Sequence, residues 1–387
     1  MPASTPLPRE LCHVRQLTDE LFQAVQPDAL YQRPIPERHR LLFYLGHLEA
    51  FDWNLLGREA LDLPAFHPAF DRLFAFGIDP TAGDLPDDRP SDWPDVAEVR
   101  RYNQNTRERI DRALPEIPDS RVEAAIEHRL MHAETLAYLL HQLPHQSKQP
   151  QPAPVAPAGE APRERTVEIP AGRAVLGLSP EAGFGWDNEY QAHAVDVPAF
   201  SIARYKVTNQ EYLEFVRAGG PPPFFWVQRD QAWFYRGMFA DVPLPLDWPV
   251  YVTQCQAQEY ARWRGRVLPT EAQFQRAAAG LPPSQNAGFR YWDPIPVTAD
   301  DAAADPLGPA QMTGNGWEWT STVFGPFPGF EPFAFYTNYS VPFFDGQHYV
   351  LKGGSPRTAL RLLRPSFRNW FRPSYPYIYA TFRLVES

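Results

Sequence analysis

Residues 146–165, QSKQPQPAPVAPAGEAPRER, most strongly constrain what this chain can fold into. The segment is rich in Pro, Ala and Gln, and its only large apolar residue is Val155. Such a composition favours an extended, semi-rigid linker between separately folded parts. We therefore predict a first domain over residues 1–148, a Pro-rich linker over 149–165 and a second domain over 166–387.

The composition limits the classes of function. Hydrophobic residues make up 44% of the 387 residues and charged residues 21%, as in ordinary globular proteins. A formal charge of −10 lacks the basic surface that binds nucleic acid, and no stretch approaches the ~18 consecutive apolar residues of a membrane span. We expect neither nucleic acid nor membrane as a partner, and the oligomeric state stays open. With only Cys12 and Cys255, a disulfide scaffold and a Cys-rich zinc module are excluded, and a reducing cytoplasm fits best.

Apolar residues of the first part recur with helical spacing. Tyr44, Leu48, Phe51 and Leu55, for example, form a stripe along one helix face. A bundle of this kind often builds a metal site in its core. The sequence predicts a four-helix bundle with helices over about 9–25, 36–57, 94–113 and 120–143.

The second part has a different texture, in which short β-rich runs alternate with Pro- and Gly-rich loops. Three short helices are predicted by capping boxes that start at Thr208, Thr253 and Thr270. The fold class is therefore multidomain, an all-α bundle followed by an irregular α+β domain. The predicted strands are Thr166–Ile169, Ala194–Val197, Tyr349–Lys352 and Tyr379–Leu384.

Two pairs of histidines have a spacing of four residues. His128 and His132 lie one turn apart on the strongest helical segment, so their rings can converge on one ion. His141 and His145 have the same spacing, but Pro144 interrupts the helix between them. Spacing alone therefore leaves a metal site and a pair of helix-surface histidines as alternatives.

His47 strengthens the metal hypothesis. It lies in FYLGHLEAFDWN at the border of a buried face, where a lone histidine is usually a core residue. A bundle, however, places the middle of the second helix against the fourth, which would bring His47 towards His128 and His132. Three imidazoles leave coordination positions open and suit Fe, Zn, Cu or Ni, so hydrolysis by zinc is the chemical rival of iron chemistry.

The combined motifs resemble the hercynine oxygenases, the sulfoxide synthases of ergothioneine biosynthesis. His47 in GHLEAFDWN together with His128 and His132 resembles their DinB-like iron-binding domain. The second part is similar to the formylglycine-generating-enzyme fold, a C-type-lectin-like α+β domain. The matching runs are FGWDNEYQAH, RYKVTNQEY, RVLPTEAQFQRAA, GNGWEWT, VLKGGS and RPSFRNWFRPSYPYIYATFR.

This resemblance implies a non-haem Fe(II) held by His47, His128 and His132. It further implies that the thiolate of a sulfur donor (cysteine or γ-glutamylcysteine) and the imidazole of hercynine bind the iron, followed by O2. The reaction forms a C–S bond at imidazole C2 and oxidises the sulfur to a sulfoxide.

The resemblance also assigns roles in the second domain. Tyr336 and Tyr339 of FYTNYS match active-site tyrosines, and Tyr336 is the candidate catalytic acid. Asn369 and Trp370 of FRNW match positions that contact hercynine, whose quaternary ammonium favours an aromatic face. Phe371 completes the predicted substrate-binding set.

Two departures from the family pattern concern the sulfur donor. Phe371 stands where some γ-glutamylcysteine-using members have an acidic residue that meets the donor's ammonium group. Met131 stands where such members have Gln. Their loss favours free cysteine. Arg100 and Arg101 could receive a donor carboxylate, but such charges more often form a solvated helix face.

Several alternatives remain at this stage. Tyr44 or Tyr102 could supply the acid instead of Tyr336. A selenoneine-type enzyme would share the iron site, whereas ovothiol-type relatives commonly carry a fused methyltransferase, of which the sequence shows no Gly-rich cofactor signature. A non-catalytic binding module is a third reading. Formylglycine-generating activity needs a copper-binding cysteine pair, whereas the second domain contains only Cys255.

Overall fold

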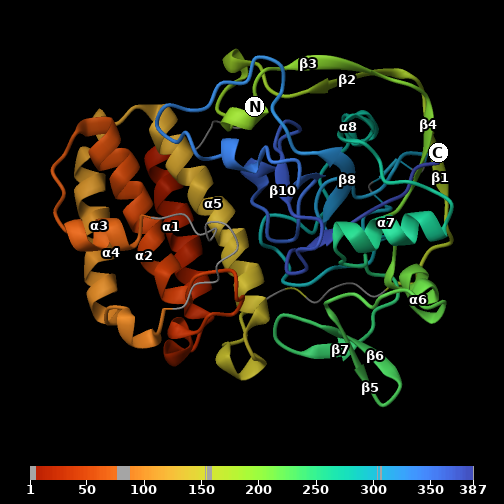
Figure 1. Cartoon of the computed structure of the whole chain (residues 1–387), viewed down its shortest axis with the longest axis horizontal. Helices are drawn as coiled ribbons and strands as arrows, with labels where there is room; N and C mark the ends of the chain where they lie inside the picture. The colour runs from red at the N-terminus through yellow and green to blue at the C-terminus, as the bar shows by residue number, and fades with distance from the viewer. Residues whose placement is uncertain are drawn as a thin grey trace. The chain divides into compact units, whose positions relative to one another are not determined.

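The computed structural model divides the chain into two compact units, Met1–Gln151 and Pro152–Ser387 (Figure 1). The predicted linker lies partly outside the described residues. Its C-terminal end packs on the second unit, where Glu164 forms ion pairs with Arg264 and Arg266. None of the described helices is long and apolar enough to cross a membrane. The structure describes residues 6–75, 88–152, 154, 159–302, 304–305 and 307–386.

Four long helices dominate the described part of the first unit, as predicted. The first of them packs on the last, and the second packs on the two that follow it in the bundle. They are α1 (Leu7–Gln23), α2 (Leu41–Asp52), α4 (Val96–Ala113) and α5 (Asp119–Gln142). The shorter elements are α3 (Pro68–Leu73), the π-helical η2 (Trp53–Glu59), and the 3-10 turns η1 (Pro27–Tyr31), η4 (Pro90–Asp92), η5 (Leu114–Glu116) and η6 (His145–Ser147).

Helix α2 is buried on all sides, not along one stripe. Every residue of it except Phe51 is buried, since α4 and α5 cover it and α3 packs against it. A Cβ at Gly46 would lie 2.6 Å from the ring of Phe74, so only glycine allows this close approach. The predicted helix over 36–57 thus begins later, at Leu41, and continues beyond Asp52 as the π-helical η2.

The strands of the second unit form small sheets. A four-stranded sheet has the order β10-β9-β8-β11, with only the β8–β11 pair parallel, and the others are β1-β4, β2-β3 and β5-β6-β7. The strands are β1 (Thr166–Ile169), β2 (Gly172–Leu176), β3 (His193–Val197), β4 (Phe200–Ala203), β5 (Trp226–Arg229), β6 (Ala232–Arg236), β7 (Asp241–Pro243), β8 (Trp317–Val323), β9 (Tyr349–Lys352), β10 (Asn369–Phe371) and β11 (Ala380–Thr381).

The three predicted capping boxes begin the three described helices of this unit. In each case the threonine hydroxyl accepts from the backbone N–H three residues on, at 3.1–3.2 Å, with the side chain of that residue bonding back. The helices are α6 (Asn209–Arg217), α7 (Gln254–Trp263) and α8 (Glu271–Ala278). The 3-10 turns are η7 (Pro180–Ala182), η8 (Asp187–Glu189), η9 (Val341–Phe343) and η10 (Leu360–Leu362).

The predicted strand Tyr379–Leu384 is wrong in extent, because only Ala380 and Thr381 pair with β8. Further along, the backbone changes partners: the carbonyls of Phe382 and Leu384 accept from the N–H groups of Val207 and Ala203. Alternating apolar residues marked an extended segment correctly, but not the partner of each residue.

The motif GNGWEWT contributes a buried ion cluster as well as buried tryptophans. Glu318, on β8, lies 2.7 Å from Lys206 and 2.6 Å from Arg383, and all three side chains are fully buried. Although burial raises the pKa of the Glu318 carboxyl, the charges of Arg383 and Lys206 hold it below its ordinary value. Within the part of the chain that the structure describes, this carboxylate is the anion that pairs with both buried cations.

We expect Glu318→Gln to lower the free energy of unfolding by about 3–5 kcal/mol, because it leaves two buried cations uncompensated. Urea denaturation followed by tryptophan fluorescence measures this. Because the folded-state pKa is depressed, the contribution is present above the ordinary value of 4.5 and is lost as the pH falls below it. The difference between wild type and variant should therefore shrink in acid. Glu386→Gln, which breaks an exposed pair with Arg266, is the control and should cost less than ~1 kcal/mol.

Candidate metal centre

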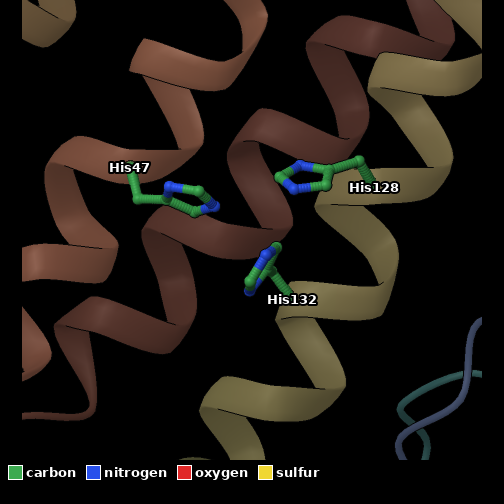
Figure 2. Close-up of side chains that lie close together, drawn as sticks. All are labelled: His47, His128 and His132. Atoms are coloured by element: carbon green, nitrogen blue, oxygen red, sulfur yellow. The ribbon is translucent and has the colours of Figure 1, made fainter. Parts of the chain in front are cut away.

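The three predicted histidines lie together in the first unit. His47 comes from α2, and His128 and His132 come from successive turns of α5; Figure 2 shows the rings converging. Their potential ligand atoms all lie within 4.8 Å of one another. Among the described residues, no other group of three His, Cys, Asp or Glu side chains is placed in this way. His141 and His145, with the same spacing in sequence, form no such cluster there.

The hydrogen bonding of His47 presents one ring nitrogen to the centre. Its Nδ1 lies 2.7 Å from the carbonyl oxygen of Phe74. A carbonyl only accepts, so Nδ1 carries the proton and Nε2 keeps a free lone pair. This is the arrangement by which metal-binding histidines are usually oriented.

The three imidazoles are neutral at neutral pH. Burial lowers the pKa of His47 to about 4. Burial also lowers the pKa of His128 and of His132 well below the ordinary histidine value, and the neighbouring rings add to this effect. Neutral imidazole is the form that binds a metal ion, so no protons need to be displaced.

Aromatic side chains pack against the three histidine rings. Phe51 stacks on His128 with ring centroids 3.4 Å apart and an interplanar angle of 8°. Phe43 stacks on His47 at 5.0 Å, and the ring of Tyr44 lies 6.0 Å from that of His132. These contacts restrict the rotation of the histidine rings.

The chemistry of the donor set fits a transition metal. The Nδ1 atoms of His128 and His132 are buried, and no described residue hydrogen-bonds to either. Three neutral nitrogens with no carboxylate or thiolate suit Fe, Zn, Cu or Ni and leave positions open for other ligands. The site could therefore hold such an ion and expose it to substrates.

In the second unit the predicted residues divide between two sides of one strand. Asn369, Trp370 and Phe371 make up β10, in which successive side chains point to opposite faces. The ring of Trp370 lies 5.5 Å from that of Tyr339, which in turn lies 5.6 Å from Tyr336. Those three aromatics gather in one cluster. Phe371 starts from the other face of the strand, as Asn369 does, and stacks on Tyr375 at 5.2 Å.

Sequence reasoning missed the residues that support the two tyrosines. Trp186 stacks on Tyr339 at 4.2 Å, and Ser340 donates a hydrogen bond to the buried carboxylate of Asp187. Asn188 donates to the same serine hydroxyl at 3.0 Å. The sequence does carry a signal, because Trp186, Asp187 and Asn188 all belong to the run FGWDNEY, a motif of the family resemblance.

The alternative candidates have different surroundings. Tyr44 is fully buried beside His132. Tyr102, 2% exposed, donates its hydroxyl to Asp71 at 2.9 Å, and burial and that carboxylate raise its pKa far above the ordinary value, which makes it a poor acid. Arg100 and Arg101 are exposed on α4, as a solvated helix face would be.

The comparisons with known proteins cover both units. Residues 10–145 match the family model of the DinB superfamily, and residues 151–387 match that of the Sulfatase-modifying factor enzyme 1-like domain. Among solved structures, PvdO from Pseudomonas aeruginosa has a TM-score of 0.43 at 20% identity, covering 57% of this chain and 93% of that one.

Curated relatives match along the whole length. The hercynine oxygenase of Mycolicibacterium thermoresistibile is 32% identical, with 100% of this chain and 95% of the relative covered. That of Mycolicibacterium smegmatis is also 32% identical, with 99% and 91% covered. Ergothioneine biosynthesis protein 1 of Neurospora crassa is 26% identical, and the match covers 94% of this chain and 56% of that protein. The domain order and the enzyme class predicted from the sequence are confirmed, and the chain belongs to the hercynine oxygenase family.

Proposed function

We propose that this chain is a non-haem Fe(II)- and O2-dependent sulfoxide synthase that joins a thiol donor to C2 of the hercynine imidazole. The observation that carries the proposal is the convergence of His47, His128 and His132 in a chain that hercynine oxygenases match from end to end. In the balanced reaction, hercynine, a thiol RSH and O2 give the C2 sulfoxide and one water. The C2–H and S–H bonds break, and O2 supplies the oxygen atoms of the sulfoxide and of the water.

Iron bound by the three histidines would supply the redox chemistry that activates O2. The residues around the site orient the three histidine ligands. Phe51 and Phe43 fix the ring planes of two ligands, and the Phe74 carbonyl fixes the tautomer of His47. Neutral ligands leave a dipositive ion uncompensated, which favours an anionic thiolate as a further ligand.

Tyr336 is the proposed proton donor to the reacting oxygen. It is half-buried beside Tyr339, in the cluster that also contains Trp370. Tyr339 and Trp370 would bind hercynine, whose trimethylammonium group is attracted to aromatic faces. Desolvation by this cluster strengthens such an interaction from about 0.5 to about 2 kcal/mol. Asn369 is the further proposed hercynine contact; it starts from the opposite face of β10, and its side-chain oxygen accepts from the backbone N–H of Trp370 at 2.9 Å.

The proposed sulfur donor is free cysteine. Phe371 presents a ring stacked on Tyr375, where some relatives that use γ-glutamylcysteine present a carboxylate. No charge at this position could then pair with the ammonium group of the longer donor. The proposed compartment is the cytoplasm, in agreement with two cysteines, Cys12 and Cys255, that are both exposed and unpaired.

The first of three functional predictions concerns the metal. Alanine at His47, His128 or His132 should abolish retention of Fe(II) by the full-length protein, because two nitrogens cannot hold the ion against chelation by buffer. Iron content after anaerobic loading and gel filtration measures this, with circular dichroism to verify the fold. His13→Ala, an exposed histidine on α1, is the control and should retain one iron per chain. Full iron retention by His47→Ala would remove that residue from the site.

The second prediction concerns the acid. Tyr336→Phe should slow sulfoxide formation by ~10²–10⁴-fold, the usual contribution of a positioned acid–base group, while metal and substrates still bind. The donor's sulfinic acid, from addition of O2 to the thiol alone, should increase as a side product. Mass spectrometry of the products measures both. Tyr349→Phe on β9 is the control. A wild-type rate and product ratio in Tyr336→Phe would exclude Tyr336 as the acid.

The third prediction concerns the donor. Assayed with hercynine, O2 and each donor separately, the wild type should prefer cysteine to γ-glutamylcysteine and to a selenosugar. Phe371→Asp should raise relative turnover of γ-glutamylcysteine, because the carboxylate can pair with its ammonium group. Phe371→Asn, without the charge, is the matched control. Equal donor preference in all three proteins would contradict a role for this position.

A further inference from the structure

A buried arginine lies between the two histidines of α5. Arg129 follows His128 directly, and its side chain is only 1% exposed. A guanidinium keeps its charge in any protein environment, so burying it inside a helical bundle needs compensating groups. Among the described residues, the acidic groups that bond to it both come from α2, the helix that carries His47.

Arg129 bonds to three residues of α2. Its Nη2 lies 2.6 Å from Asp52 Oδ2, and donates to the carbonyl oxygen of Leu48 at 3.1 Å. Its Nη1 donates to Glu49 Oε1 at 3.1 Å. Glu49 and Asp52 are themselves 1% and 0% exposed. One side chain of α5 thus bonds to the stretch of α2 that begins directly after His47.

A second arginine holds the same carboxylate from another helix. Arg107, on α4, contributes two nitrogens to Glu49 Oε1, at 2.7 and 2.9 Å. It also binds Asp19 of α1 through a bidentate pair at 2.7 and 2.8 Å. The guanidinium of Arg129 reaches α1 as well, donating to Thr18 at 3.2 Å. The network therefore ties α2 to all of the other long helices of the bundle.

This arrangement is poorly explained by stability alone. Well-packed hydrophobic residues of similar volume often stabilise a core as well as a buried ion pair, or better. Directional hydrogen bonds also fix the register of α2 against α5. Sliding α2 along its axis by one residue would move His47 by about 1.5 Å and rotate it by about 100°. Metal–nitrogen distances tolerate only about 0.2 Å, so the centre needs such a constraint.

We propose that Arg129 is a positioning residue for the metal centre. With Glu49 and Asp52 it fixes α2 against α5, so that His47 converges on the two histidines of α5. It touches neither metal nor substrate. The inference rests on the proposed function only for the identity of the three ligands.

Co(II) binding by the full-length protein tests the inference without reference to turnover. Arg129→Lys keeps the charge but cannot reproduce the fork that spans two carboxylates. We expect its Kd for Co(II), from titration of the visible absorption bands, to rise about 10–100-fold, as is typical when groups behind metal ligands are lost. The band positions and intensities should change too, because they report ligand geometry. A purely structural role would leave these bands unchanged.

The triple variant Arg129→Met/Glu49→Met/Asp52→Leu removes the buried charges shared by α2 and α5 and separates positioning from stability. Arg107 keeps its pair with Asp19, and Arg15 of α1 keeps its pair with Asp111, so each remaining arginine retains a carboxylate. The triple variant should fold, with a melting temperature close to wild type or higher, and yet bind Co(II) as weakly as Arg129→Lys. Asp19→Asn, which weakens the ion pair between α1 and Arg107 of α4 but leaves the bonds of Arg129 to α2 in place, and Ile110→Val, which loosens the core of α4, are the matched controls. Both should keep the wild-type Kd and spectrum.

The possible results separate the role of Arg129 from the metal site itself. Wild-type affinity and spectrum in both Arg129 variants would overturn the inference, and so would the failure of both to fold, because the network would then hold the bundle and not the ligands. Equal weakening in the controls would also overturn it. Absence of Co(II) binding by the wild type would instead contradict the proposed metal site itself.

Discussion

The packing of α2 against α5 is the contact on which the metal centre depends. His47 and the pair His128 and His132 are about 80 residues apart in sequence and meet only because these helices lie side by side. Non-directional burial of apolar side chains would hold the helices together but would tolerate sliding. The buried Arg129 supplies the directional bonds, which is why the charged network and the neutral ligand cluster occur next to each other.

Burial has opposite consequences for the three histidines and for the charged network of Arg129. Desolvation keeps the three imidazoles neutral, so each can offer a lone pair to a cation. The same desolvation would strongly destabilise the charged Arg129 if the Glu49 carboxylate did not face it as an anion. Burial raises the pKa of Glu49, but the charges of Arg129 and Arg107 outweigh this effect and hold it at about 2. One bundle interior thus contains both uncharged ligands and a paired charge network.

Sequence reasoning predicted what depends on local spacing and missed what depends on backbone groups or on burial of charge. The helical period predicted the pairing of His128 with His132, and bundle geometry predicted the approach of His47. The carbonyl of Phe74 carries no signature, since every residue has one. Arg129 in a helical pattern indicates a solvated face, and only the tertiary structure shows that it points inward. The predicted strand Tyr379–Leu384 is longer than the observed strand Ala380–Thr381 for a related reason, because alternation of apolar residues indicates extended backbone but not its pairing partners.

Strand β10 shows how specificity could change within this family without loss of the acceptor site. Trp370 packs among Phe324, Phe343 and Tyr339, so the aromatic cluster constrains its side chain from several directions. Phe371 projects from the opposite face, where Tyr375 is its stacking partner. A substitution at 371 therefore alters a surface that Trp370 does not line, although the residues are adjacent in sequence. Under the proposed function, the donor preference is free to vary at this position while the hercynine-binding aromatics remain fixed by their packing.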